Sequence, residues 1–319
     1  VLPGLLVAGS RHRGEPIAIR TKPTALSPEN PGISVVGGLE FRGGLVLRSK
    51  EKSFGGFSGL HVGADGDHLT AVTDKGDWLT ARLLYDERGR LDDVTDAEMG
   101  ALRDANGKRL DEDEGDAEAL AELAGGGFAV AFEGHHRILT YPRGLDAPAD
   151  PLPKPDGLKD APDNGGVESL VTLSDGRLLA LTEKYGKHRL YHGWTWKRGK
   201  WTPLEYRAGH DSNPADATLL PSGDLLVLER GDDSDDGPVL RLQRVPKGDI
   251  GSGEVLEGET LFEIRRPLLV DNFEGVACRA GEDGEPLVYI ISDDDFDEDK
   301  RTVLLMFALR HQGKSRGEP

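Results

Sequence analysis

The sequence predicts an all-β fold: a single β-propeller of five or six four-stranded blades, closed by an N-terminal strand. Two observations support this prediction. A unit of two apolar segments joined by a glycine-containing turn recurs five times, at intervals of roughly 50 to 60 residues. The composition, with 43 Gly and 19 Pro among 319 residues, favours short strands and turns over long helices.

The most complete copy of this unit runs from Asp271 to Leu309. It contains a Phe-Glu-Gly opening on a short strand, an Asp-Gly turn, an apolar strand, an acidic cluster and a final strand. Shorter copies cover Gly56 to Gly76, Asp116 to Gly134, Gly166 to Lys184 and Ala215 to Gly231. Because a tight turn pairs two strands antiparallel, the start of the first strand lies beside the end of the second. The acidic residues at these two places should therefore meet on one rim.

If the repeats close radially, these residues form two rings around one mouth of a central channel. The first ring contains Glu118, Glu168, Asp216 and Glu274, with Ser58 in the equivalent place of the first repeat. The second ring contains Asp74, Glu133, Glu183, Glu229 and Asp293. So many carboxylates in one place repel one another unless a cation lies among them. The sequence therefore predicts a calcium site at this rim.

The segments outside the repeats divide the chain into an N-terminal extended segment (1–34), the propeller (35–310) and a C-terminal tail (311–319). Residues 35–48 resemble outer-strand material, and we expect them to pair beside Thr302 to Leu309, which closes the ring and covers two sheet edges. Between the first and second repeats, Ala97 to Arg103 predicts a short helix. The Pro-dense segment from Pro142 to Gly166 predicts an extended surface connection.

The third repeat continues into a segment rich in aromatic residues. It contains Tyr191, Trp194, Trp196 and Trp201 and predicts two outer strands. We expect these rings to pack against one another and across strands, and the alternative is a carbohydrate-binding platform.

The charge excludes some classes of function. The chain has 57 acidic and 39 basic residues, a formal charge of −18, which repels nucleic acids and anionic membranes. No segment is long enough to be a transmembrane helix. A single cysteine, Cys278, excludes an internal disulfide. We expect a monomer that binds a small anionic ligand.

Several acids of the second ring are followed at once, or after a short interval, by cations. Acids that hold a hard cation, beside bases that hold an anion, suit a phosphate ester bridged to a metal. The other interpretation is a set of ordinary rim ion pairs. The candidate substrate-binding residues are Lys75, Arg137, Lys184, Arg230, Lys300 and Arg301.

A second acidic motif lies outside the rings. Asp232 to Gly237 resembles the opening of a calcium-binding loop, but the twelfth position holds Gln243 in place of the bidentate Glu. The two interpretations are a peripheral calcium site and a solvated acidic loop.

Several segments together resemble a known family. They are FGGFSGLHVGADG, TDKGDWLTARLL, NGGVESLVTLSDGRLLALTE, LLVLERG and FEGVA followed by ISDDDF and KRTVLLMFAL. From about Val36 to Leu309 the chain resembles the bacterial phytase-like family described as having esterase-like activity. The resemblance implies a β-propeller and a distant similarity to calcium-dependent propeller phytases, whose acidic channel mouth binds calcium and phosphate. It implies as rim residues Glu168, Glu183, Glu229, Arg230, Glu274, Asp293 and Asp294.

The resulting hypothesis is a calcium-dependent phosphoric ester hydrolase. We expect Glu229 or Asp293 to activate water. The expected metal ligands are Asp74, Glu118, Glu133, Glu168, Glu183, Asp216, Glu274 and Asp294. The alternative is a non-catalytic propeller that binds a ligand or a protein and uses calcium structurally.

We expect the protein to work in the periplasm or outside the cell, because an acidic site of modest affinity fills where calcium is near millimolar. The apolar start, Val1 to Ala8, is consistent with the remnant of a cleaved export signal. The alternative is a cytosolic protein with trimmed ends.

Overall fold

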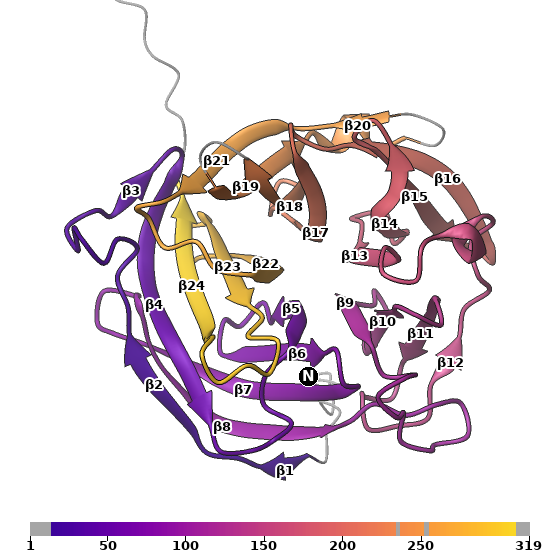
Figure 1. Ribbon diagram of the computed structural model, residues 1–319, viewed down its shortest axis with the longest axis horizontal. Helices are drawn as coiled ribbons and strands as arrows, with labels where there is room; N and C mark the ends of the chain where they lie inside the picture. Colours follow the sequence, from indigo (N-terminus) through magenta and orange to yellow (C-terminus); the bar gives the residue numbers. More distant parts are fainter. Residues whose placement is uncertain (1–13, 234–236, 252–254, 311–319) are drawn as a thin grey trace, which may run out of the picture.

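Short strands joined by tight turns build a closed ring of five sheets around a central axis (Figure 1). The computed structural model describes residues 14–233, 237–251 and 255–310. The segment Val1 to Ala8 and the tail 311–319 lie outside these ranges. The ring confirms the predicted β-propeller and gives it five blades.

The first two blades differ in their number of strands. Blade 1, from its inner to its outer edge, consists of β5 (Phe57–Val62), β6 (His68–Thr73), β7 (Asp77–Tyr85), β8 (Leu91–Ala101) and β1 (Glu15–Pro16). Blade 2 consists of β9 (Ala117–Glu122), β10 (Phe128–Phe132), β11 (Arg137–Tyr141) and β12 (Asp150–Pro151).

The next two blades are joined by a strand from the chain segment of blade 4 that pairs with blade 3. Blade 3 consists of β13 (Val167–Thr172), β14 (Leu178–Lys187), β15 (Leu190–Lys197), β16 (Lys200–Arg207) and β20 (Val255–Glu257). Blade 4 consists of β17 (Ser212–Leu219), β18 (Leu225–Asp233), β19 (Gly237–Val245) and β21 (Glu259–Arg265). The strand β20 leaves blade 4 and pairs in parallel with β16. Two 3₁₀ turns, η1 (Leu158–Asp160) and η2 (Lys247–Asp249), lie in the connections.

Blade 5 closes the ring with strands from both ends of the chain. It consists of β22 (Phe273–Ala280), β23 (Pro286–Ser292), β24 (Thr302–Leu309), β4 (Leu39–Ser49) and β2 (Ile19–Pro23), and β3 (Val35–Val36) pairs with β4. The strand β4 lies antiparallel beside β24, from Thr302 opposite Leu47 to Leu309 opposite Leu39. This pairing confirms the predicted closure by an N-terminal strand.

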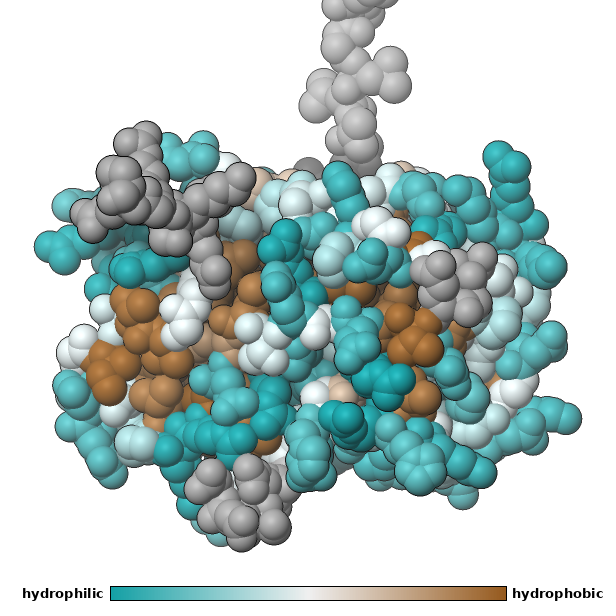
Figure 2. All heavy atoms as spheres, turned by 90° about the horizontal axis from the view of Figure 1, so that it is seen from above, coloured by the Kyte–Doolittle hydropathy of each residue, from teal (hydrophilic) through white to brown (hydrophobic). Residues whose placement is uncertain are grey.

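The apolar core lies between the blades. Five clusters of buried residues each join two neighbouring blades, and together they run around the ring. The innermost strands β5, β9, β13, β17 and β22 lie side by side around the axis (Figure 1). Because each cluster needs both of its blades, no blade can bury its apolar face alone. The side view in Figure 2 shows hydrophilic side chains over much of the outer surface, with apolar residues in the gaps between them.

The predicted helix over Ala97 to Arg103 is wrong, because most of this segment belongs to β8. The side chains of Val94, Ala97 and Met99 are buried against the cluster that joins blades 5 and 1. Tertiary burial at a strand period therefore overrides a local preference for helix. Among the described residues, no helix is long and apolar enough to cross a membrane.

The aromatic residues of blade 3 pack as expected. The rings of Trp196 and Trp201 lie 5.1 Å apart across β15 and β16. The indole N–H of Trp201 donates to the carbonyl of Pro153 at 2.6 Å, and that of Trp194 donates to the carbonyl of Asp156 at 3.2 Å. These side chains therefore hold the Pro-rich connection against the blade.

Candidate functional site

A recurring β-bulge positions the first ring. In blades 2, 3 and 5, the first strand carries one extra residue opposite the second strand, and these extra residues are Glu118, Glu168 and Glu274. A bulge redirects the side chain of the extra residue. The three glutamates come from the starts of inner strands that surround the same axis, and their carboxylates meet there.

In blades 1, 2, 3 and 5, one backbone hydrogen bond fixes the residue of the second ring. The residue that follows the last strand pair before the bulge donates its N–H to the carbonyl two residues before the first-ring position. The donors and acceptors are Asp74 and Gly56 (3.0 Å), Glu133 and Asp116 (2.8 Å), Glu183 and Gly166 (3.2 Å), and Asp293 and Asn272 (2.8 Å). The predicted meeting of the two acidic positions therefore occurs in blades 2, 3 and 5, whereas blade 1 has Ser58 in the first ring.

Blade 4 departs from the predicted rings. Its strands pair Pro214 with Glu229, so the extra residue of the bulge is Ala215 and the residue after the pair is Arg230. The register therefore moves Asp216 and Glu229 one residue out of the two rings. A one-residue offset in a strand turns a side chain to the other face.

Both displaced acids bind groups inside the fold. The Asp216 carboxylate accepts the backbone N–H of Val276 at 2.7 Å and that of Ala217 at 2.8 Å, which joins blade 4 to blade 5. Glu229 is completely buried and accepts the Tyr206 hydroxyl at 2.7 Å and the Gly209 N–H at 3.1 Å. Their positions indicate structural roles.

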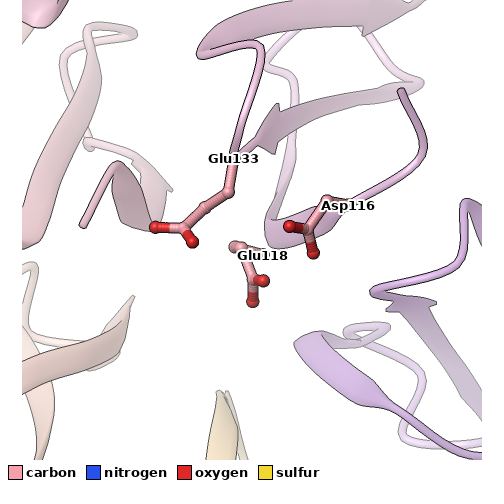
Figure 3. A group of neighbouring side chains, drawn as sticks. All are labelled: Asp116, Glu118 and Glu133. Carbon is pink, nitrogen blue, oxygen red and sulfur yellow. The ribbon is translucent and has the colours of Figure 1, made fainter. Parts of the chain in front are cut away.

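The remaining acids form one group, which we call the carboxylate cluster: Asp74, Asp116, Glu118, Glu133, Glu168, Glu183, Glu274, Asp293 and Asp294. Two triads within it bring carboxylate oxygens within 4.8 Å of one another. One is Asp116, Glu118 and Glu133, which Figure 3 shows converging from the start of β9 and the end of β10. The other is Glu118, Glu168 and Glu274. Glu118 belongs to both triads.

Asp116 is a member that the sequence analysis missed as a ligand. It stands two residues before Glu118 and just ahead of β9, outside the two acidic positions of the repeat. The Asp-x-Glu spacing is the signal that could have found it, because residues two apart in extended chain share a face.

Crowding in the cluster disfavours ionisation. Burial, followed by the charge of neighbouring carboxylates, raises the pKa values of Glu118 and Glu168 well above their usual range. Burial and the neighbours Asp116, Asp294 and Glu274 outweigh Lys75 and raise the pKa of Asp74 to about 7. Burial and the charge of Glu274 raise the pKa of Asp293 to about 8. A bound cation would reverse these shifts, because it favours the charged forms.

The residues of the cluster fit a hard cation. Their donors are all carboxylate oxygens, which calcium and magnesium prefer and which zinc sites use less. The Asp74 Oδ1 atom is buried and has no hydrogen-bond partner. The two triads could hold a metal ion between blades 2, 3 and 5, with Glu118 at their common point.

Two cations border the cluster. The Arg230 guanidinium, at the second-ring position of blade 4, contacts Glu274 and Asn272, and its Nη2 lies 3.4 Å from the Glu183 carboxylate. The Lys184 ammonium lies 2.6 Å from Glu183 and donates to Asn164 at 2.7 Å. These residues place positive charge beside the acids, as the sequence predicts.

The other predicted cations contact different groups. The Lys75 ammonium lies 3.7 Å from the centre of the Phe296 ring. The Arg137 guanidinium lies over the ring of Phe132, at 4.3 Å. Lys300 pairs with Asp295, and Arg301 pairs with Asp271 at 3.0 Å.

Asp294 joins two blades at the rim. It accepts the Gly56 N–H at 3.1 Å and the Thr302 hydroxyl at 3.0 Å. The predicted peripheral loop, Asp232 to Gly237, includes residues 234–236, which lie outside the described ranges.

Comparison with solved structures finds proteins of low sequence identity. A candidate gluconolactonase has 12% identity and a TM-score of 0.48, and the alignment covers 91% of this chain and 94% of that one. A gluconolactonase from Xanthomonas campestris has 12% identity and a TM-score of 0.45, with 93% and 96% covered. A luciferin-regenerating enzyme has 13% identity and a TM-score of 0.42, with 82% and 96% covered.

Comparison with curated proteins finds no match. Residues 52–296 match the family described as "Phytase-like: Esterase-like activity of phytase". The match extends from just before β5 to the loop after β23, so it includes the bulge positions of all five blades and the whole carboxylate cluster. The chain belongs to the phytase-like family.

Proposed function

We propose that the protein is a calcium-dependent phosphoric ester hydrolase. The observation that carries this proposal is the position of Arg230, whose Nη1 atom contacts both Glu274 of the carboxylate cluster and the neighbouring Asn272. An acidic group that holds a cation, with a guanidinium at its edge, suits a phosphate group bound by both. Membership of the phytase-like family supports the same substrate class.

In this proposal Asp116, Glu118, Glu133, Glu168 and Glu274 hold the calcium ion. When bound, the ion would offset the negative charge of the phosphate and of the transition state. Arg230 and Lys184 bind the phosphate oxygens and orient the ester. Arg230 keeps its charge at any physiological pH, because Glu274 and Glu183 outweigh the effect of burial and raise its pKa.

Asp293 is the proposed general base. Its carboxylate accepts the Asn272 side-chain N–H at 3.3 Å and the Asp295 N–H at 2.7 Å, so its orientation is fixed. It takes a proton from water as the water oxygen bonds to phosphorus, and the bond from phosphorus to the alcohol oxygen breaks. The proton then passes to the departing alcohol. Glu229 is not assigned this role, because buried hydrogen bonds already occupy its carboxylate.

Phosphate release tests the proposal. The full chain is stripped with a chelator, then assayed on p-nitrophenyl phosphate with calcium returned at up to millimolar concentration. We expect release that depends on calcium and stops when the chelator is added again. The alternative, a non-catalytic ligand-binding module, predicts calcium binding without release of phosphate from this ester.

We also propose that the protein works in a compartment with calcium near the millimolar range, such as the periplasm or the exterior. A rim that carries acids and their counter-ions together is expected to bind calcium with modest affinity, as extracellular calcium modules do. Fractionation of the native cells tests this, and recovery of the protein with cytosolic markers would contradict it.

A further inference from the structure

A cleft of about 640 Å³ lies beside the carboxylate cluster, where blades 3, 4 and 5 meet. Arg230 and Asn272 belong to its wall and also contact each other, so the cleft begins where the proposed phosphate site ends. Its volume is in the range of pockets that hold drug-sized ligands. The inference below rests on the proposed function and concerns which ester the site accepts.

The cations around this cleft already have acidic partners. Lys184 pairs with Glu183, Arg230 with Glu274 and Glu183, and Lys300 with Asp295. Asp271, also in the wall, pairs with Arg301. A polyphosphate would need several cations that can turn toward it, and each of these would first have to leave a carboxylate.

The electrostatic field of the whole molecule also disfavours binding of a polyphosphate. The formal charge of −18 gives a net repulsion of a polyanion and lowers its rate of association. A single phosphate group can still be bound by calcium and Arg230 together. The electrostatics therefore favour a ligand with one phosphate.

The wall of the cleft is partly apolar. It includes Pro238 and Val270, which are half-buried, and Val239 and Leu240, which are buried. The amide side chain of Asn213 is held by the Tyr191 hydroxyl at 2.5 Å. The apolar part of this wall can bind hydrocarbon, whereas its polar side chains already contact one another or other protein groups, which leaves them less available to a sugar or an inositol ring.

We propose that the cleft binds the alcohol part of a phosphate monoester with an apolar alkyl chain, and that a polyphosphate such as phytate is a poor substrate. The phosphate lies at Arg230 and the chain extends along Pro238 and Val270. This arrangement explains how three cations can be paired with acids and the site still select an anionic ester: the apolar contacts supply part of the binding.

A comparison of ethyl phosphate with hexyl phosphate tests the inference, because their leaving groups have nearly equal pKa values and differ only in apolar length. We expect kcat/KM with calcium to rise by about tenfold or more from ethyl to hexyl, since each added methylene removes apolar surface from water. We expect phytate to be hydrolysed more slowly than hexyl phosphate.

Variants at Val270 locate the effect. Val270→Asp should lower kcat/KM for hexyl phosphate several-fold more than for ethyl phosphate. Because Val270 also packs against the cluster that joins blades 4 and 5, the milder Val270→Thr is measured in parallel, and thermal melting verifies the fold of both. Val35→Asp, an exposed site outside the cleft, is the control and should leave the ratio of the two esters unchanged.

The outcomes separate this inference from the proposed function. If ethyl and hexyl phosphate are hydrolysed equally, or if phytate is preferred, the inference is wrong and the enzyme proposal stands. If no ester is hydrolysed, binding of the non-hydrolysable ethylphosphonate and hexylphosphonate decides. If hexylphosphonate binds more tightly than ethylphosphonate and Val270→Asp abolishes the difference, the cleft binds an alkyl chain but the protein is not a phosphoric ester hydrolase. Equal binding of the two phosphonates, or no binding, contradicts both the cleft proposal and the hydrolase proposal.

Discussion

Blades 2 and 4 share the same bulge geometry at the rim, but blade 2 carries acidic side chains there and blade 4 carries a basic one. In both, the inner strand carries a bulge, and the residue that follows the last strand pair before the bulge lies beside it. At the three equivalent positions blade 2 has Asp116, Glu118 and Glu133, and blade 4 has Asn213, Ala215 and Arg230. The repeat therefore fixes where a side chain points, and the residue at each position decides what the rim binds.

The difference gives the mouth of the ring two unlike sides. The blade 2 side supplies oxygen ligands for a cation, and the blade 4 side supplies a guanidinium and the cleft beside it. A ligand with an anionic head can contact both sides at once. Substitutions on the two sides should therefore have different consequences for metal binding, activity and stability.

The largest expected effect is on the blade 4 side. Arg230→Ala should lower kcat/KM for a phosphate monoester by about 100-fold or more, because it removes a charged donor to the phosphate. The same change should increase calcium affinity, since Glu274 and Glu183 lose their counter-ion. Initial rates and isothermal titration calorimetry measure the two quantities.

Arg244→Ala is the matched control. Arg244 is also on blade 4 and pairs with Asp224 at 2.7 Å and Glu259 at 3.2 Å, away from the cluster. It should change neither activity nor calcium affinity. If Arg230→Ala were as active as the wild type, Arg230 would not bind the substrate.

On the blade 2 side the expected effect is on the metal. Glu118→Gln should weaken calcium binding by about tenfold to a hundredfold, because Glu118 is common to both triads and its charge is lost. Glu122→Gln, an exposed residue at the other end of β9, is the control. If both variants bind calcium like the wild type, the two triads are not the metal site.

The sequence predicts most of the fold because the fold depends on local signals. Glycine turns between apolar strands reveal the repeat, and the unpaired outer strand at residues 35–48 reveals the closure. The helix predicted near Ala97 failed because burial between blades decides that segment.

The candidate site is predicted less completely, because its geometry depends on register. A bulge displaces a ring position by one residue, and only the pairing of Pro214 with Glu229 shows that Ala215 and Arg230 occupy the ring positions of blade 4. Spacing alone therefore assigned Asp216 and Glu229 to the rings.

A smaller effect, on stability, follows from the raised pKa values of Asp74 and Asp293, to about 7 and about 8. Unfolded aspartates titrate near pH 4, so between pH 4 and 8 the folded state binds more protons than the unfolded state. Without calcium, stability should therefore fall as pH rises through this window, with Tm about 5–10 °C lower at pH 8.5 than at pH 5.5. Thermal melts in chelator measure this.

Calcium should remove much of this pH dependence, because it binds the ionised carboxylates at pH 8.5 and stabilises the fold by mass action. The double variant Asp74→Asn, Asp293→Asn should also reduce it. A Tm that is independent of pH in chelator would show that these two groups do not titrate as described.

The smallest expected effect tests the difference between blades 2 and 4, because it concerns an acid of blade 4 that lies one residue outside the second ring. Glu229→Gln should destabilise the fold by about 1–3 kcal/mol, since an amide N–H₂ would face the Gly209 N–H or the Gln243 amide, which now donate to the carboxylate. Calcium affinity should stay unchanged, in contrast to Glu118→Gln, which should bind calcium more weakly and be more stable than the wild type at high pH in chelator. Thermal melting and calorimetry on both variants measure the contrast. If Glu229→Gln lost calcium and kept its Tm, Glu229 would belong to the rim, and the assignment of Arg230 to its ring position would be wrong.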